Sequence, residues 1–368
     1  MDFNFEVAQQ AARRWQKRQP EREAARAALA TGNISAVESP ERIKMRLDRL
    51  AGHAAAPLGA ADSLTGSALI ENFTMERVLG RDDLSSINTL ELALAVGRFV
   101  GRVAIGSAAG RLAGYGTGFI VSPCLLLTNN HVLPSTSAAA SSQVEFDYQL
   151  DRAGRQLPVR AFRLDPDRFF LTDTKLDFTL VAVRPVSEDH VELKFFAWMP
   201  LIESEGKALV GDPLNIIQHP QGEPKQIAFR NNRLVDLFDQ YAHYETDTKP
   251  GSSGSPVFND QWEVIALHHS GVPRMKDGQY VATDGSTWKP GMDPDRLAWV
   301  ANEGIRVSSL VSKIKKQKLT GEPARLRDEL LQLSPPSPFE VAAQYTEAVR
   351  AVPKLTPPAA SSEVVINI

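Results

Sequence analysis

Short apolar or alternating segments, separated by Gly, Pro, Asn and Asp, dominate the chain between about residues 119 and 267. The clearest are 119–121, 125–127, 144–146, 178–183, 216–217, 225–229 and 264–267. Strand-like segments of this length, broken by turn residues at this spacing, are typical of all-β barrels and sandwiches. The central part of the chain is therefore predicted to be mostly β.

The composition is that of a globular protein and excludes several classes of function. Hydrophobic residues make up 43% and charged residues 23% of the 368 positions, and the formal net charge is −3. That charge gives no basic field for nucleic acid, so no nucleic-acid partner is expected. A single cysteine, Cys124, rules out an intramolecular disulfide framework. We find no motif for a metal or a cofactor and expect neither.

No apolar run approaches the roughly 20 residues of a membrane-spanning helix, so no membrane partner is expected. The first residues also lack the basic start and apolar core of a secretory signal, which predicts a cytoplasmic location.

The turn at 251–256, with the sequence GSSGSP, can present Ser253 as a nucleophile. A serine hydroxyl becomes reactive only when a base takes its proton and donors receive the oxyanion that forms. The backbone amides of Gly251 and Ser253 are candidates for those donors, because glycine lets the backbone approach a substrate carbonyl closely. Gly- and Ser-rich turns are common, and this one is a weak signal by itself.

His131 and Asp177 lie at the ends of two of the predicted strands, where a rigid scaffold can present them. A carboxylate at the start of the apolar run 178–183 is costly to bury without a partner. An imidazole is such a partner, and the carboxylate fixes its tautomer. The rival acid Asp173 has no strand directly after it, and the rival base His219 lies between Asp177 and Ser253.

The order His, Asp, Ser along the chain is the order of chymotrypsin-like enzymes. His131 precedes Asp177 by 46 residues, and Asp177 precedes Ser253 by 76. This spacing puts the base and the acid in one half and the nucleophile in the other, as a cleft between two barrels requires. His219 would break the order, so we interpret it as structural or as lining the substrate groove.

The three motifs together resemble the trypsin-like (chymotrypsin-fold) serine peptidases, and in particular their bacterial glutamyl-endopeptidase branch. The resemblance runs from about Thr74 to Lys318 and is carried by GTGFIVSPCLLLTNNHVL, LDFTLVAV and YETDTKPGSSGSPVFNDQWEVIALHHSGV. It implies a mostly β fold of two six-stranded antiparallel β-barrels. It also implies a catalytic triad of His131, Asp177 and Ser253, with an oxyanion hole at Gly251 and Ser253.

The same resemblance implies an acid-binding specificity pocket. Thr248, five residues before the nucleophile, and His268 take the positions that hold the substrate's acidic side chain in that branch. Such an enzyme would be an endopeptidase that cuts proteins after Glu, then Asp. The preference is expected to weaken as the pH rises, because a protonated His268 would bind the acid better. The backbone of His269, Ser270 and Gly271 would pair with the substrate as an added strand.

The resemblance and the changes of composition along the chain together predict five units. They are a helical N-terminal region with regulation as one interpretation of its role (1–75), a first β-barrel with His131 and Asp177 (76–200), a second with Ser253 (201–304), a C-terminal helix (305–333) and a Pro-rich tail (334–368). A helix start at Ser39-Pro40-Glu41 and a short helix near 340–350 are also expected.

Two alternatives to a constitutively active enzyme remain. The first is a catalytically silent double barrel used for binding. The second is a protease that its N-terminal region holds inactive until a partner or cleavage releases it, and a regulatory protein partner would bind through the N-terminal helices. Ser252 stands where zymogen-type relatives have the Asp that pairs with a newly cut N-terminus, so activation by that route is not expected.

Overall fold

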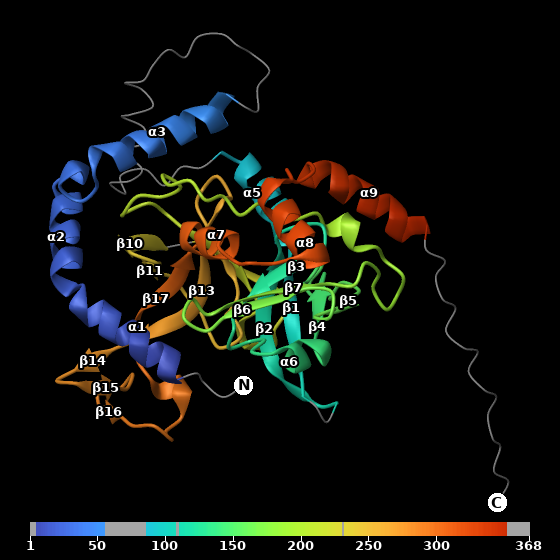
Figure 1. The fold of residues 1–368 in the computed structure, drawn as a ribbon. Coiled ribbons are helices and arrows are strands. Elements are labelled where there is room, and N and C mark those ends of the chain that lie inside the picture. Colours follow the sequence, from blue (N-terminus) through green and yellow to red (C-terminus); the bar gives the residue numbers. More distant parts are fainter. Residues whose placement is uncertain (1–4, 56–85, 108–109, 230–231, 352–368) are drawn as a thin grey trace, which may run out of the picture.

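The computed structural model describes residues 5–55, 86–107, 110–229 and 232–351. Helices occupy the two ends of this described part, and most of the elements between them are strands (Figure 1). The described part is mostly β with two large antiparallel sheets, as predicted. The boundary expected near residue 75 lies outside the described residues.

The first sheet holds His131 and Asp177 in the turns beside two of its strands. Its strands, in spatial order, are β5 (Arg160–Arg163), β4 (Gln143–Phe146), β1 (Val100–Gly106), β2 (Leu112–Ile120), β3 (Leu125–Thr128), β7 (Phe178–Ala182) and β6 (Phe170–Asp173). An isolated bridge between Leu164 and Val183 joins the ends of β5 and β7. Six strands thus make one circuit, and β6 is a seventh strand beside β7.

The second sheet carries the Ser253 turn before one of its strands. In spatial order its strands are β10 (Arg233–Phe238), β11 (Tyr241–Glu245), β17 (Trp299–Arg306), β13 (Val264–Pro273), β12 (Pro256–Phe258), β8 (Asn215–Gln218) and β9 (Gln226–Ala228). A bridge between Pro213 and Arg233 connects the β8 end to β10. Each sheet therefore has one strand more than the six expected, and only one isolated bridge closes each circuit.

Separate apolar cores fill the two sheets. Phe146 and Phe196 stack in the first with ring centroids 4.7 Å apart, and Ile216, Tyr244 and Val257 are buried in the second. A third cluster joins the sheets to the C-terminal helices, and Cys124, a free thiol, is buried in it. The alternation of strand residues produces these cores, because successive side chains point to opposite faces.

The remaining elements cover the sheets. They are α5 (Asn88–Gly97), α6 (Thr136–Ala140), α7 (Val307–Lys315), α8 (Gly321–Gln332), α9 (Pro338–Ala351) and a small sheet of β14 (Met275–Lys276), β15 (Gln279–Val281) and β16 (Thr287–Trp288). The predicted C-terminal helix from 305 is in fact the end of β17 followed by two helices. The first helix, α7, ends at Lys315, and α8 begins at Gly321, which has a φ of +64°. The helix expected near 340–350 is α9.

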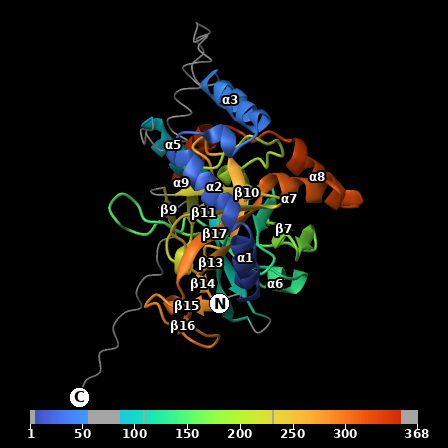
Figure 2. The ribbon, with the colours of Figure 1, turned by 90° about the vertical axis from the view of Figure 1, so that its left-hand side faces the viewer.

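The N-terminal helices α1 (Phe5–Lys17), α2 (Gln19–Ala30) and α3 (Pro40–Ala55) form an arc along the second sheet (Figures 1 and 2). α1 lies against β13, and α2 lies against β10. The expected helix start is present, since the Arg42 amide hydrogen bonds to the Ser39 hydroxyl at 3.3 Å. Three alanines of α1, Ala8, Ala11 and Ala12, are fully buried, so this helix sits close to the sheet.

Candidate active site

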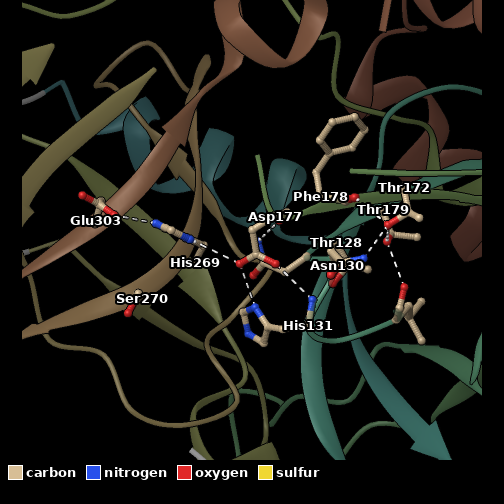
Figure 3. A network of polar contacts seen from close by, with 12 residues as sticks. Thr128, Asn130, His131, Thr172, Asp177, Phe178, Thr179, His269, Ser270 and Glu303 are labelled. Carbon is tan, nitrogen blue, oxygen red and sulfur yellow. Dashed lines mark hydrogen bonds and ion pairs between the residues drawn. The ribbon is translucent and has the colours of Figure 1, made fainter. Parts of the chain in front are cut away.

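His131 and Asp177 are directly hydrogen-bonded in the structure (Figure 3). Asp177 immediately precedes β7 and has a φ of +41°, and its carbonyl accepts a hydrogen bond from the Asn129 amide at 2.9 Å. His131 Nδ1 lies 2.7 Å from Asp177 Oδ2, and the His131 backbone N–H donates to Oδ1 at 3.0 Å. These bonds put the ring proton on Nδ1, which leaves Nε2 free to act as a base.

A second imidazole contacts the same carboxylate. His269 Nδ1, from β13, lies 3.2 Å from Asp177 Oδ2 (Figure 3). Burial by itself raises the pKa of Asp177, but His131 and His269 together outweigh burial and hold the pKa well below its usual range. Asp177 is therefore an ionised carboxylate between two imidazoles. The sequence suggested only the first contact.

The turn before Ser253 is built on Pro250 and Gly251. The Ser252 N–H donates to the Lys249 carbonyl at 3.0 Å, and Gly251 has a φ of +97°. Proline at the second position and a positive φ at the third are the features of a type II turn, which needs glycine there. A Cβ on Gly251 would also lie 2.7 Å from the His219 carbonyl oxygen. Glycine is thus required both for the turn and for the close packing.

Thr117, from β2, ties this turn to the first sheet. Its N–H donates to the Ser253 carbonyl at 2.8 Å, and its hydroxyl donates to the Gly251 carbonyl at 2.8 Å. The same hydroxyl accepts the His219 N–H at 3.1 Å. Thr117 is completely buried and was not singled out from the sequence, because a threonine inside a strand carries no local sign of this role.

Ser253 itself is half-buried, between the buried Ser252 and Gly254. Among the described contacts, no hydrogen bond joins its hydroxyl to His131. Catalytic hydrogen bonds are often long in a free enzyme and tighten when substrate binds. The structure thus brings His131 and Asp177 together directly and holds the Ser253 turn against the same sheet through Thr117.

Thr248 and His268 both bond to one cross-strand pair, Tyr244 and Asn302. The Thr248 hydroxyl donates to Asn302 Oδ1 at 2.5 Å, and His268 Nδ1 lies 2.7 Å from the Tyr244 hydroxyl. Burial, then the nearby His269 and His131, lower the pKa of His268 to about 3. The free protein therefore holds a neutral His268 near neutral pH, so a pH dependence of the acid preference would require that this ring gains a proton when the substrate binds. Asn302 was not expected in this pocket.

The backbone of His269, Ser270 and Gly271 lies within β13. Ser270 pairs with Glu303 and Gly271 with Asn302 on β17, and the register shifts between His268 and Ser270. His269 is the extra residue of a β-bulge at this point. A bulge changes the direction in which a strand side chain points, and that of His269 reaches Asp177.

His219 does not line a groove. It is completely buried, its Nδ1 lies 3.0 Å from the Glu223 carbonyl oxygen, and its ring stacks on Tyr148 at 6.0 Å. Burial, then the nearby Lys225 charge, lower its pKa well below the usual range. Of the two interpretations made from the sequence, the structural one applies.

The requirements of a metal site and of a membrane-spanning helix are not met by the described residues. No group of three or more His, Cys, Asp or Glu side chains in the described ranges is arranged to hold a metal ion. No helix within those same ranges is long and apolar enough to cross a bilayer. A cavity of about 1160 Å³ lies between α5 and β9, away from His131, Asp177 and Ser253.

Residues 116–267 match the family described as "trypsin-like peptidase domain", in agreement with the resemblance of the three motifs. The His131–Asp177 pair and the serine turn fall within this stretch, and the two sheets also include β1 and β17 outside it.

Among curated proteins, the chain is 39% identical over 260 residues to the uncharacterized protein y4fB of Sinorhizobium fredii, covering 66% of this chain and 39% of the relative. It is 23% identical over 163 residues to the glutamyl endopeptidase of Staphylococcus aureus, covering 44% of this chain and 48% of the relative. The chain thus spans less than half the length of these two relatives. A solved structure, the active form of the Rv3671c protease of M. tuberculosis, is similar with a TM-score of 0.40 and 14% identity, covering 66% of this chain and 92% of that one.

Proposed function

We propose that this protein is a serine endopeptidase that cleaves peptide bonds through an acyl-enzyme. Ser253 attacks the scissile carbonyl, and His131 Nε2 takes its proton and later gives it to the leaving amine. Asp177 holds the His131 tautomer and stabilises the imidazolium. The Gly251 and Ser253 amides receive the oxyanion.

The observation that carries this proposal is the hydrogen bond between His131 and Asp177, together with the Gly251 turn that precedes Ser253. The pair sets the ring proton on Nδ1, and Thr117 fixes the turn to the sheet that bears the pair. The match to the trypsin-like peptidase domain supports the same chemistry.

A fluorophosphonate probe tests the proposal, since it reacts only with an activated serine. We expect stoichiometric labelling of the full chain at Ser253, and no labelling after heating or in Ser253→Ala. Labelling is measured by mass spectrometry of the modified peptide. An unlabelled but folded protein would contradict the proposal and favour one of the two alternatives, a double barrel that binds without catalysing or a protease that its N-terminal region holds inactive.

We further propose that the enzyme prefers Glu before the cut. A neutral His268 that accepts a hydrogen bond from the Tyr244 hydroxyl at Nδ1 carries its own proton on Nε2, where it can donate a hydrogen bond to a carboxylate. The Thr248 hydroxyl, now bonded to Asn302, is the second donor. The similarity to the staphylococcal glutamyl endopeptidase supports this assignment.

This pocket predicts a preference for Glu over Gln that changes by less than about threefold between about pH 6 and pH 8.5. The reason is that the pKa of His268, lowered to about 3, lies below this range, so the free enzyme keeps a neutral ring throughout. The ratio of kcat/KM for paired Glu and Gln peptides measures it. A ratio that drops tenfold per pH unit would show that His268 gains a proton with the substrate.

Thr248→Val is expected to lower the ratio of kcat/KM for the Glu and Gln peptides by about tenfold, because one hydrogen bond to a charged group is lost.

A further inference from the structure

We propose that the N-terminal helix α1 is a positioning element of the active site, acting from Arg14 through Glu303 and His269 on Asp177. The proposal rests on the proposed peptidase function. It differs from the alternative in which the N-terminal region holds the enzyme inactive.

The Arg14 side chain extends from α1 to the second sheet. The buried alanines of this helix bring it close to β13, where Ala11 packs on Val272 and Ala301. The Arg14 guanidinium lies over the Tyr241 ring, 4.0 Å from its centroid, and makes two bonds to Glu303, at 2.9 Å and 2.6 Å. A planar fork with two parallel bonds fixes the orientation of the carboxylate as well as its charge.

Glu303 is the centre of the network. It lies on β17 with no exposed surface, and His243 of β11 is directly opposite it in the ladder. His243 Nε2 is 2.9 Å from one of its oxygens, and His269 Nε2 is 2.8 Å from the other. Burial alone raises the pKa of Glu303, but Arg14, His243 and His269 outweigh it and hold the pKa well below its usual range. A buried carboxylate at this place needs such partners.

His269 connects Glu303 to the proposed triad, because it contacts both Glu303 and Asp177. Because it is the extra residue of the bulge in β13, its ring lies between two carboxylates, with Nδ1 towards Asp177 and Nε2 towards Glu303 (Figure 3). When both ring nitrogens carry protons, each donates to one carboxylate. Burial lowers the pKa of His269, but the hydrogen bonds to Asp177 and Glu303 outweigh it and the pKa is raised.

Groups of alternating charge therefore run from the helix towards the base, in the order Arg14, Glu303, His269 and Asp177, and Asp177 contacts the His131 ring. If Arg14 is removed, Glu303 keeps its charge but loses its fixed orientation, and it draws His269 away from the 3.2 Å contact with Asp177. Asp177 is then held less firmly against His131. The helix acts only through these residues and does not touch the reacting atoms.

The test compares full-length variants. Arg14→Met keeps the side-chain stem over Tyr241 but removes the charge, and it is expected to lower kcat by about tenfold with little change in KM. Arg14→Lys keeps the charge without the two parallel bonds and should recover part of that loss. The matched control is Arg49→Met, which removes another partly buried ion pair, Arg49–Glu263 at 2.6 Å, between the N-terminal helices and the second sheet. Arg49→Met should keep kcat within about twofold of the parent value, while its Tm should fall about as much as that of Arg14→Met.

A readout that needs no catalysis separates this proposal from the proposed function. The Nδ1 proton of His131, hydrogen-bonded to Asp177, gives a far-downfield proton NMR signal. We expect Arg14→Met to shift or broaden it, Arg14→Lys to restore it in part, and Arg49→Met to leave it unchanged. A signal and a kcat that respond equally to Arg14→Met and Arg49→Met, or to neither, would overturn the proposal. A parent protein that the fluorophosphonate does not label, but whose signal responds to Arg14→Met alone, would instead overturn the peptidase function.

Discussion

Ser253→Ala is expected to lower kcat by about 10⁴- to 10⁶-fold, the largest effect of any single substitution in this protein. The change removes the nucleophile and leaves only the oxyanion donors and substrate binding. The substitution is small and the site is half-buried, so Tm should move by only a few degrees. Initial rates on a Glu-containing peptide, with active-site titration of the parent, measure the loss.

Ser255→Ala is the control for that substitution. Its hydroxyl lies in the same turn but donates to the Ser252 carbonyl at 2.6 Å, and no described contact joins it to His131. We expect a loss of a few-fold at most. If Ser253→Ala kept full activity, or if both variants lost the same activity, Ser253 would not be the nucleophile.

The second large effect is expected for Asp177→Asn, which should lower kcat by about 10⁴-fold. The Asn side-chain NH2 can donate a hydrogen bond to His131 Nδ1, which places the ring proton on Nε2, the atom that must accept a proton from Ser253. The new side chain also removes one of the two carboxylates around His269, so the pKa of His269 should fall towards its ordinary value. Single-turnover kinetics measure the first effect, and NMR titration of labelled histidines measures the second.

Asp173→Asn is the matched control, four residues away. The Asp173 carboxylate accepts hydrogen bonds from the Lys175 and Leu176 backbone amides at 3.0 Å and 2.8 Å and forms an ion pair with Lys313. It therefore stabilises a turn, and none of these contacts is with His131. Its substitution is expected to leave kcat within about twofold. Equal losses in the two variants would contradict the role proposed for Asp177.

Much of the scaffold could be predicted from sequence because its signals are local. Short alternating segments predicted the two sheets, Ser39-Pro40 predicted the start of α3, and the residues before β7 indicated that Asp177, not Asp173, faces His131. A positive φ at Gly251 follows from the Pro-Gly turn. These features depend on a few neighbouring residues, and a sequence shows them directly.

The C-terminal helices show where that local view stops. One helix was expected from residue 305, but β17 extends to Arg306, and Val307, Leu310 and Ile314 of α7 pack into the cluster that joins the sheets to the C-terminal helices. Pairing with β11 and β13 decides the conformation of 305 and 306, and no local preference opposes it.

The proposed triad and its turn were thus determined by the sequence itself, as a set of residues in a specific order and spacing. Their environment was decided by the tertiary structure. Glu303 lies 289 positions from Arg14 and 34 from His269, and the three meet only because α1 docks on the second sheet and a bulge turns His269 towards Asp177. Burial likewise sets the pKa of His268 at about 3. Such contacts arise between distant segments, and no pattern along the chain encodes them locally.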